Sequence, residues 1–262
     1  MALNVLKHDT FSEKDHVDTY HLQIEALKLA FADAERYLAD INYMEYTVQE
    51  LLSESYAKER RKQIQHYAIT PTCGTPPKGG TVYFATADNE GNMVSFIQSN
   101  YMGFGSGIVI PNTGIALHNR GHNFSFDETS PNALGPLKKP YHTTIPGFLT
   151  KKNIPIGPFG VMGGFMQPQG HLQVIMNTID FNLNPQASLD APRFQWVKGK
   201  QVLVEPNFPT HLITALENRG HQISIEHDVG TFGREQIIWC DPETGIYVGG
   251  TEGRCDGSIA CW

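Results

Sequence analysis

The sequence has a deficit of basic residues. Lys and Arg together number 20 against 27 Asp and Glu, so the chain of 262 residues carries a net charge of −7. This balance argues against a nucleic-acid partner, because a phosphate-binding surface needs clustered Lys and Arg. The one basic run, at residues 58–62, contains Glu59 and lies in a helical pattern, which indicates a solvated helix face.

The sequence also lacks a hydrophobic run that a bilayer would accept. Residues 91–119 and 153–179 contain no Asp, Glu, Lys or Arg, and each stretch exceeds the ~20 residues that a membrane span needs. Both are rich in glycine, proline, asparagine and glutamine, which a lipid-facing helix does not tolerate at that density. We therefore predict no membrane span and expect buried strands and tight loops there.

Cysteine is scarce, with four residues and no CxxC pair. Scattered thiols in so long a chain indicate free cysteines rather than a disulfide scaffold. The N-terminus has no basic segment followed by an apolar core and a small-residue cleavage site, so it does not match a secretory signal. An HxxxH pair, His118 and His122, surrounds Gly121 in a strand-like segment, and we expect no zinc site there.

Nucleotide-binding and serine-hydrolase signatures are missing as well. The glycines of GFGSG at 103–107 run into a strand pattern, whereas a dinucleotide fingerprint opens a helix. The chain contains no GK[ST] of a P-loop and no GxSxG. These absences exclude the commonest glycine-rich catalytic motifs.

Apolar residues make up 40% of the chain, enough for a sizeable core. Apolar positions recur at helical spacing over 17–39, and 47–66 opens with Thr47 and Glu50 in a capping-box pattern. Residues 70–80 hold three prolines and three glycines, which predicts a loop.

After this loop the pattern changes to strands, interrupted by two predicted helices near 168–180 and 208–219. Strands are expected at 81–87, 92–99, 107–111, 114–119, 147–150, 160–164, 200–205, 221–226, 235–240 and 246–250. Many strands and few helices after a helical segment predict an α+β sandwich.

The junction Gly80-Thr81 places a hydroxyl directly after a small residue, between the loop and the first strand. A threonine hydroxyl there can attack the preceding carbonyl, and hydrolysis of the ester leaves a new N-terminal threonine. Such a threonine carries its own base, because its free α-amine takes the hydroxyl proton. On composition alone, an ordinary threonine that begins a strand is the alternative.

The chain resembles the C-terminal half of gamma-glutamyltransferases and of related cephalosporin or glutaryl acylases, which are N-terminal-nucleophile hydrolases. The resemblance rests on HLQIEALKLAFADAERYLAD, GGTVYFATADNEGNMVSFIQSNYMGFGSGIV, GIALHNRGHNFSFD, NALGPLKKPYHTTIP, GPFGVMGG, DAPRF and EGRCDGSIACW, which occur in family order. It implies an αββα four-layer sandwich with antiparallel sheets. It also divides the chain into 1–80, a large-subunit tail, and 81–262, a small subunit.

The resemblance assigns the catalytic roles. Thr81 would be the nucleophile released by cleavage at Gly80-Thr81, and Ser99 falls where the transferases place a second threonine that bonds its oxygen. Gly163 and Gly164 fall on the paired glycines whose N–H groups stabilise the oxyanion. Nucleophile, base and oxyanion donors all come from the chain, so the resemblance implies no metal and no organic cofactor.

The substrate pocket departs from the transferase pattern. The positions that hold the glutamyl α-amine and α-carboxylate in true transferases correspond here to Tyr101, Arg120, Asn123 and His142-Thr143. An aspartate that would pair an ammonium is lost, and Arg120 adds a guanidinium suited to a carboxylate. We expect a glutaryl-like acyl group with a distal carboxylate, alongside γ-glutamyl amides as the family's substrates. A structural ion pair for Arg120 and a strand-edge position for His142 are the alternatives.

The family carries a further half upstream, which the resemblance implies as a partner segment absent from this chain. A homo-oligomer is left open, and the compartment is not fixed, although a cytoplasmic one is favoured. An uncleaved Thr81 has no free amine and cannot serve as nucleophile and base together. The competing hypothesis is therefore a catalytically silent fragment or a pseudo-enzyme that serves as an assembly module.

Overall fold

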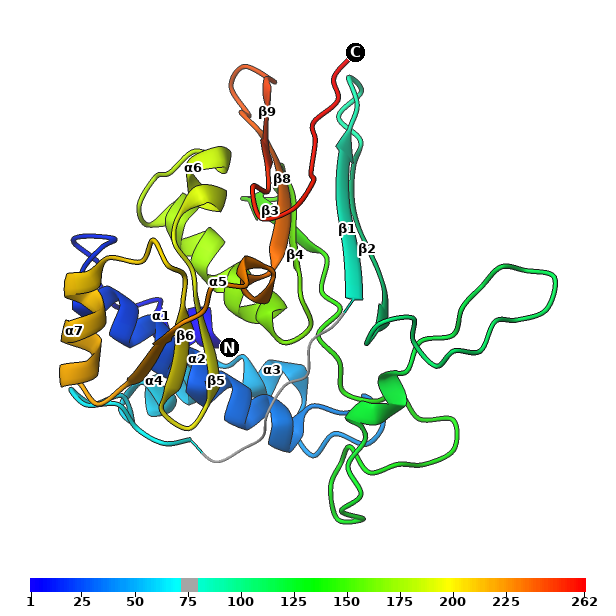
Figure 1. The fold of residues 1–262 in the computed structure, drawn as a ribbon, viewed down its shortest axis with the longest axis horizontal. Helices are drawn as coiled ribbons and strands as arrows, with labels where there is room; N and C mark the ends of the chain where they lie inside the picture. The colour runs from blue at the N-terminus through cyan, green and yellow to red at the C-terminus, as the bar shows by residue number, and fades with distance from the viewer. Residues whose placement is uncertain (72–79) are drawn as a thin grey trace. The chain divides into compact units, whose positions relative to one another are not determined.

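The structure, a computed structural model, describes residues 1–71 and 80–262 (Figure 1). Its elements are α1 (Ala2–Leu6), α2 (Val17–Tyr37), α3 (Val48–Leu51), α4 (Glu54–Arg61), β1 (Gly80–Ala87), β2 (Met93–Tyr101), the 3-10 turn η1 (Arg120–Asn123), β3 (Gly147–Lys151), β4 (Ile154–Met162), α5 (Met166–Ile179), α6 (Pro185–Asp190), β5 (Phe194–Lys198), β6 (Gln201–Val204), α7 (Thr210–Asn218), β7 (Gln222–Ile225), η2 (Val229–Phe232), β8 (Arg234–Cys240) and β9 (Tyr247–Thr251). None of these helices is long and apolar enough to cross a membrane.

The described chain divides into two compact units that interleave along the sequence. The first gathers residues 1–71, 119–142 and 194–225, and the second gathers residues 80–118, 143–193 and 226–262. This division follows packing, so it does not test the predicted boundary between 1–80 and 81–262. The predicted boundary stays a prediction.

In the first unit, α2 lies against a three-stranded sheet in the order β5-β6-β7. Aromatic rings join the two: Tyr20 of α2 meets Phe194 and Phe208 edge-on, and the rings of Phe31 and Trp196 lie 5.6 Å apart. β5 and β6 are antiparallel, whereas β6 and β7 run parallel with α7 between them. The prediction of antiparallel sheets therefore does not hold for the pair β6 and β7, which is parallel.

The prediction of one continuous helix over 47–66 is wrong, because the structure has two separate helices there, α3 and α4. Thr47 and Glu50 do form the predicted capping box at the start of α3. The helix then stops at Leu51, because the Ser53 side chain accepts a hydrogen bond from the Tyr56 N–H and caps a separate helix, α4. Serine competes well at such a position because its hydroxyl satisfies a free N–H of a new first turn.

In the second unit, the β1-β2 hairpin packs on a four-stranded antiparallel sheet in the order β3-β4-β8-β9. The helices α5 and α6 cover the other face of this larger sheet, where Phe159, Val174, Leu189, Ile237 and Trp239 form a buried core. Helix, sheet and sheet thus form successive layers within the unit, in agreement with the predicted sandwich.

Two glycines make the close packing of these layers feasible. A Cβ at Gly160 would lie 2.4 Å from the Tyr83 ring, which packs there from the hairpin. A Cβ at Gly170, in the middle of α5, would lie 2.8 Å from Val161 of β4. Glycine normally weakens a helix interior, so Gly170 indicates that close contact between helix and sheet outweighs this cost.

The strands predicted at 107–111 and 114–119 are wrong. Only an isolated bridge between Val109 and Ala116 forms there, flanked by hydrogen bonds from Ile110 to Ile115 and from Leu117 to Ile108. The segment follows glycines with positive φ and extends as an arm (Figure 1). Its apolar side chains are exposed, so they lack the packing that strands of this composition usually receive.

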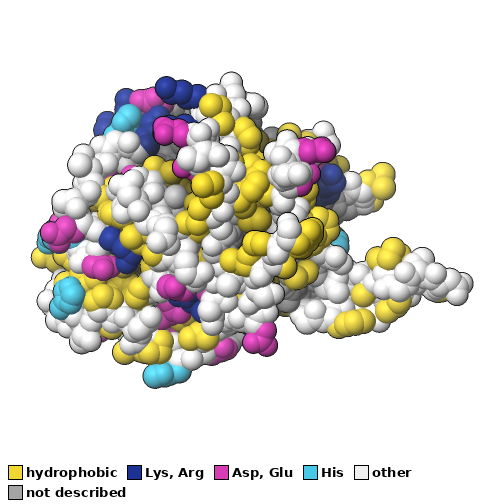
Figure 2. Space-filling model, turned by 90° about the horizontal axis from the view of Figure 1, so that it is seen from above, with side chains coloured by type: hydrophobic (Ala, Val, Ile, Leu, Met, Phe, Trp, Pro, Cys, Tyr) yellow, Lys and Arg dark blue, Asp and Glu magenta, His cyan; other side chains and the backbone are white. Residues whose placement is uncertain are grey.

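The outer face of the β1-β2 hairpin is apolar and exposed. Val82, Phe84, Val94 and Phe96 are 43–52% exposed, and the rings of Phe84 and Phe96 stack 4.7 Å apart. Tyr83, on the opposite face, is buried. Figure 2 shows hydrophobic side chains exposed over one face of the molecule, with few charged groups among them. Contiguous apolar surface of this kind is typical of an interaction site.

Candidate functional site

Thr81 lies at the start of β1, where strand pairing fixes its neighbour. It pairs with Ser99 of β2, and its hydroxyl donates a hydrogen bond of 2.9 Å to the Ser99 Oγ. Both side chains are partly buried. The pairing therefore brings together the two hydroxyl residues that the family resemblance joins in one site.

A β-bulge interrupts the ladder at the predicted cleavage junction. Gly80 pairs with Tyr101 and Thr81 with Ser99, so Asn100 is an extra residue opposite the Gly80-Thr81 peptide bond. Tyr101 is 1% exposed and has φ of 74°, a conformation that costs a bulky residue about 1–3 kcal/mol. Its N–H donates to the Ser99 Oγ at 2.9 Å, so the strained residue also holds the serine hydroxyl.

Gly163 and Gly164 form the turn between β4 and α5. Both have positive φ, 132° and 60°, which glycine adopts without a steric cost. The Gly163 carbonyl accepts from the Met166 N–H, and the Gly164 carbonyl accepts from the Gln167 N–H. The buried Thr143 hydroxyl also donates to the Gly164 carbonyl, at 2.8 Å. These bonds orient the Gly163–Gly164 peptide, which carries the Gly164 N–H, and the Gly164–Phe165 peptide that follows it.

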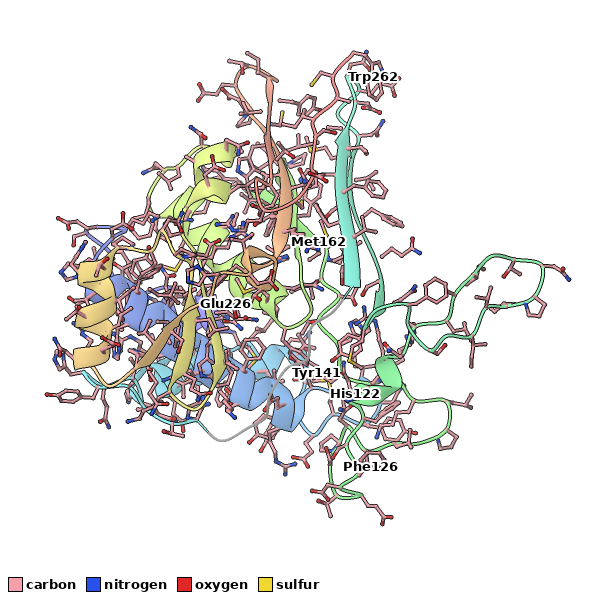
Figure 3. The ribbon with its side chains drawn as sticks, viewed as in Figure 1. His122, Phe126, Tyr141, Met162, Glu226 and Trp262 are labelled. Carbon is pink, nitrogen blue, oxygen red and sulfur yellow. The ribbon has the colours of Figure 1, made fainter. Side chains whose placement is uncertain are left out.

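The second unit therefore contains the predicted nucleophile, its serine partner and the glycine pair. Figure 3 labels Met162, the last residue of β4, directly before the glycines. The hairpin that carries Thr81 and the strand that leads to Gly163 pack on each other, with the Tyr83 ring against Gly160 of β4. Within the hairpin, the Tyr83 hydroxyl bonds the Ser95 hydroxyl at 2.9 Å. Burial raises the pKa of Tyr83, so its hydroxyl stays protonated.

The remaining predicted pocket residues belong to the first unit. Arg120 is 7% exposed in η1. The Asn123 carboxamide donates to the Tyr141 carbonyl at 3.0 Å, which ties the two sides of this segment together, and Tyr141 is labelled in Figure 3. His142 is exposed. Their roles in substrate binding stay predictions, as do those of Tyr101 and Thr143.

A buried charged network in the second unit was not found by sequence reasoning. Arg193 pairs with Glu252 at 2.9 Å and lies 3.5 Å from Glu235, and Arg254 pairs with Glu252 at 2.7 Å. Burial raises the pKa of Glu235 to about 8, against the opposing effect of Arg193. Arg193 and Glu252 stand in the motifs DAPRF and EGRCDG, which were the only sequence signal for them.

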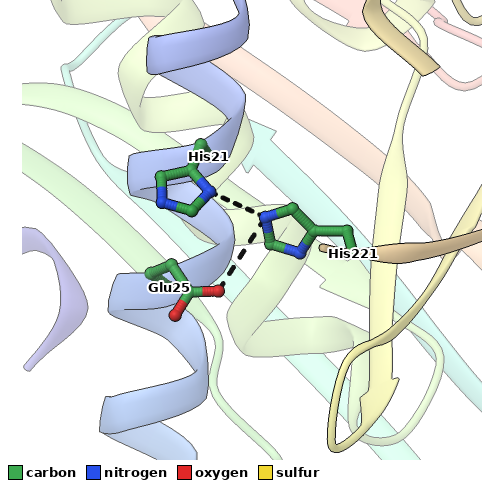
Figure 4. Close-up of side chains that lie close together, drawn as sticks. All are labelled: His21, Glu25 and His221. Carbon is green, nitrogen blue, oxygen red and sulfur yellow. Dashed lines mark hydrogen bonds and ion pairs between the residues drawn. The ribbon is translucent and has the colours of Figure 1, made fainter. Parts of the chain in front are cut away.

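A second buried cluster joins His21, Glu25 and His221 in the first unit (Figure 4). Their ligand atoms lie within 4.8 Å of one another, the only such group of three among the described residues. The His21 Nδ1 bonds the His221 Nε2 at 2.8 Å, and Lys28 donates to Glu25 at 2.6 Å. An ammonium therefore already neutralises the carboxylate, which leaves little reason for a metal cation there.

One cavity of the first unit lies apart from the predicted site. A cavity of about 330 Å³ lies among α2, α3 and α4 and is lined by Tyr37, Tyr46, Tyr56 and Glu59, among others. No predicted site residue lines it. His118 and His122, the HxxxH pair, belong to no three-residue metal cluster in residues 1–71 and 80–262. The described cysteines Cys240, Cys255 and Cys261 are free, as predicted, and Cys73 lies outside the described residues.

Comparison with known proteins matches residues 1–262 to the family described as Gamma-glutamyltranspeptidase. A relative from Bacillus subtilis, the glutathione hydrolase-like YwrD proenzyme, is 35% identical over 98% of this chain and 50% of its own length. The oxamate amidohydrolase proenzyme of Klebsiella pneumoniae is 32% identical over 95% of this chain and 48% of its own. The chain thus spans about half the length of these curated relatives.

Among solved structures, cephalosporin acylase from Bacillus halodurans is similar over the whole of this chain and 48% of its own. The two share 64% sequence identity and superpose with a TM-score of 0.94. This likeness confirms the predicted α+β fold, that of the N-terminal-nucleophile hydrolases.

Proposed function

The chain belongs to the gamma-glutamyltranspeptidase family, and on that premise we propose that it is the nucleophile-bearing half of an amidohydrolase or acyltransferase that cleaves itself at Gly80-Thr81. In the first reaction, the Thr81 hydroxyl attacks the Gly80 carbonyl carbon. The C–N bond of the junction breaks as an ester forms, and the Thr81 nitrogen leaves as an amine. Water then hydrolyses the ester, which frees the Gly80 carboxylate and an N-terminal threonine.

The observation that carries this proposal is the hydrogen bond of 2.9 Å between Thr81 and Ser99. It joins the residue after the junction to the one hydroxyl that the family pattern requires beside a nucleophile. A serine oxygen can accept this bond and, after the proton has left Thr81, donate one to the alkoxide. The same hydroxyl therefore supports attack in both self-cleavage and turnover.

The bulge at Asn100 supports cleavage at this junction. An extra residue in a strand locally disrupts the ladder and bends the chain. A peptide bond within a regular ladder has its carbonyl and N–H committed to the neighbouring strand, whereas the bulge lies opposite the Gly80-Thr81 bond. The regular ladder is thus interrupted at the bond where nucleophilic attack would occur.

In turnover, the freed α-amine of Thr81 takes the hydroxyl proton as the oxygen attacks the substrate amide. The tetrahedral oxyanion would be held by the N–H groups of Gly163 and Gly164, donors of a type worth roughly 3–4 kcal/mol each. Collapse releases the amine and leaves an acyl-threonine ester, which water or an acceptor amine then cleaves. The hydrogen bond to the Gly163 carbonyl supports this role for the Gly164 N–H, because the two groups belong to one peptide and a rigid donor needs no reorganisation during the reaction.

For the substrate, we propose an acyl group with a distal carboxylate and no tightly held α-amine. Arg120 offers a guanidinium at a pocket position of the family, and Tyr101 stands there without the charge or amide that would bind an ammonium. The test compares hydrolysis of glutaryl-anilide and γ-glutamyl-anilide by the full-length protein. A clear preference for γ-glutamyl-anilide would contradict this substrate class and leave the nucleophile assignment unaffected.

Self-cleavage is tested on a denaturing gel. The full-length protein is expected to release a fragment of about 20 kDa, which is roughly two thirds of this chain's 29.2 kDa. The intact mass of this fragment should equal that of a polypeptide that begins at Thr81. Thr81→Ala should yield no such fragment and no anilide hydrolysis, whereas Thr86→Ala, on an exposed position of the same strand, should still cleave. An intact chain in the wild-type protein would favour the silent assembly module.

We further propose that the segment matching the upstream half of the relatives packs on the hairpin face formed by Val82, Phe84, Val94 and Phe96. The exposure of these four apolar side chains supports this, because a protein rarely leaves stacked aromatic rings in water. This chain spans about half the length of the relatives, so the half that it does not span is long enough to form such a partner.

A further inference from the structure

The turn that follows η2 lies directly behind the glycine pair. Gly233 has φ of 75°, and a Cβ at Gly163 would lie 3.1 Å from the Gly233 Cα. A Cβ at Gly233 would in turn lie 2.6 Å from Val161 and 2.8 Å from the Met162 carbonyl oxygen. The backbones of the two turns thus approach each other closely, so residues 232–233 form part of the surface on which Gly163 rests.

One guanidinium holds that turn. The Arg193 Nη1 donates to the Phe232 carbonyl at 3.1 Å and to the Gly233 carbonyl at 3.3 Å, and the Arg193 side chain is only 2% exposed. Two carbonyls bound by one planar group fix both the position and the tilt of the turn. Arginine suits this role because its guanidinium presents several donors in a rigid plane.

The guanidinium is itself locked from its other side. The Arg193 Nη2 pairs with Glu252 at 2.9 Å, and the same carboxylate oxygen accepts from the Glu235 N–H at 3.1 Å. The second oxygen of Glu252 binds Arg254, which also donates to the Leu189 and Ala191 carbonyls. Arg254 therefore shares the network with Arg193 and binds the Leu189 and Ala191 carbonyls, whereas Arg193 binds the turn at 232–233.

We propose that Arg193 is a positioning residue for the oxyanion-binding glycines: by clamping the Phe232 and Gly233 carbonyls it holds the turn against which Gly163 rests. This inference rests on the proposed function, in which the Gly163 and Gly164 N–H groups bind the oxyanion. A role of this kind affects the transition state more than the bound substrate, because the oxyanion charge develops only after attack.

The test uses Arg193→Lys and Arg193→Gln in the full-length protein, with Arg254→Lys as the matched control from the same network. Arg193→Gln leaves Glu252 paired with Arg254 but removes the cation that lies 3.5 Å from Glu235, so Arg193→Lys, which keeps a cation at this position, is the second variant. We expect both Arg193 variants to lower kcat for the anilide roughly tenfold or more with KM within about twofold, with Lys retaining more than Gln. Arg254→Lys should keep kcat within about threefold of the wild type.

Affinity for a boronic acid analogue of the acyl group gives a second readout. Such a compound forms a tetrahedral adduct with a threonine oxygen, so its affinity should fall with kcat in the Arg193 variants and hold in Arg254→Lys. Equal losses in Arg193→Lys and Arg254→Lys, an unchanged kcat, a loss confined to KM, or failure of both Arg193 variants to fold would overturn the proposal. Thr81→Ala is measured alongside, because turnover that survives it would instead contradict the proposed function.

Discussion

Ser99 has two bonding partners whose roles differ. Its Oγ accepts from the Thr81 hydroxyl and from the N–H of Tyr101, so it links the proposed nucleophile to the strained end of β2. Thr143 plays a comparable part beside Gly164, because its buried hydroxyl gives the Gly164 carbonyl a second donor besides the Gln167 N–H. At this scale, single hydroxyl groups set the geometry of the site.

Replacement of Ser99 should separate the role of its hydroxyl from that of its volume. We expect Ser99→Ala to slow self-cleavage and anilide turnover about 10–100-fold, since a bond to a developing alkoxide is worth roughly 1.5–3 kcal/mol. Ser99→Thr restores the hydroxyl and should stay within a few-fold of the wild type. Timed denaturing gels and initial rates measure both steps. Equal activity of the Ala and Thr variants would rule out a role for the hydroxyl.

The residues that sequence reasoning found and missed differ in a physical way. Thr81 was singled out by the Gly80-Thr81 junction and both Thr81 and Ser99 by the family resemblance, and the register of the hairpin then pairs the two residues. Arg193 and Glu252 lie 59 positions apart and meet only because β8, β9 and the end of α6 converge, which no local pattern encodes. The bulge at Asn100 was likewise not predicted, because the alternation of side chains around Asn100 resembles that of an ordinary strand end.

At the scale of elements, the link between α2 and β7 depends on two neutral histidines. The His21 Nε2 must donate to the Gln65 carbonyl, so its Nδ1 accepts, and the His221 Nε2 must then donate to it. Burial lowers the pKa of His21 to about 4 and that of His221 to about 2. The positive charges of Lys28, Lys200 and Arg219 also lower the pKa of His221, and those of Lys28 and Arg219 lower the pKa of His21. A proton on the His21 Nδ1 would remove the acceptor of this bond, and a proton on the His221 Nδ1 would place a charge on a buried atom that has no hydrogen-bond partner among the described residues.

This pair predicts a loss of stability in acid. Because both folded pKa values lie below the unfolded value of about 6.5, the unfolded chain binds more protons once the pH falls below that value. The contribution of the two histidines to the free energy of unfolding is fully present above about pH 6.5 and declines as the pH falls toward about 4. At pH 5 the loss is on the order of 2 kcal/mol per histidine. Urea unfolding at pH 8 and pH 5 measures it.

His221→Gln should flatten this pH dependence, and His227→Gln, at an exposed position, should not. A wild-type free energy of unfolding that is equal at pH 8 and pH 5 would show that the pair does not stay neutral in the folded state.

Helices and strands were predicted well where the periodicity of their side chains was clear. They were predicted poorly where tertiary packing decides the structure. The helix at 17–39 is present as α2 and that at 168–180 as α5, within a few residues at their ends. The strands predicted at 107–111 and 114–119 failed because β-branched composition does not make a strand without a surface to pack on. The strand β5 and the helix α6 were not predicted, because each is too short for a clear period.

For the molecule as a whole, the hairpin face gives a direct test of the proposed packing of the upstream segment. Phe84→Asp combined with Phe96→Asp should lower the stability of the full-length protein by about 1.5–3 kcal/mol per covered ring. A face left in water should tolerate the same change within roughly 0.5 kcal/mol. Urea midpoints of the full-length protein measure the difference, and Phe126→Asp, at a side chain 94% exposed, is the control.

The interleaving of the two units has a consequence for the matured protein. In the first unit, α2 packs on β5 and Tyr20 on Phe194 and Phe208, partners that lie on opposite sides of the proposed cut. Cleavage at Gly80-Thr81 would therefore turn one folded unit into a complex of two polypeptides. Its cohesion would no longer be intramolecular, so dilution would favour dissociation and unfolding would depend on protein concentration.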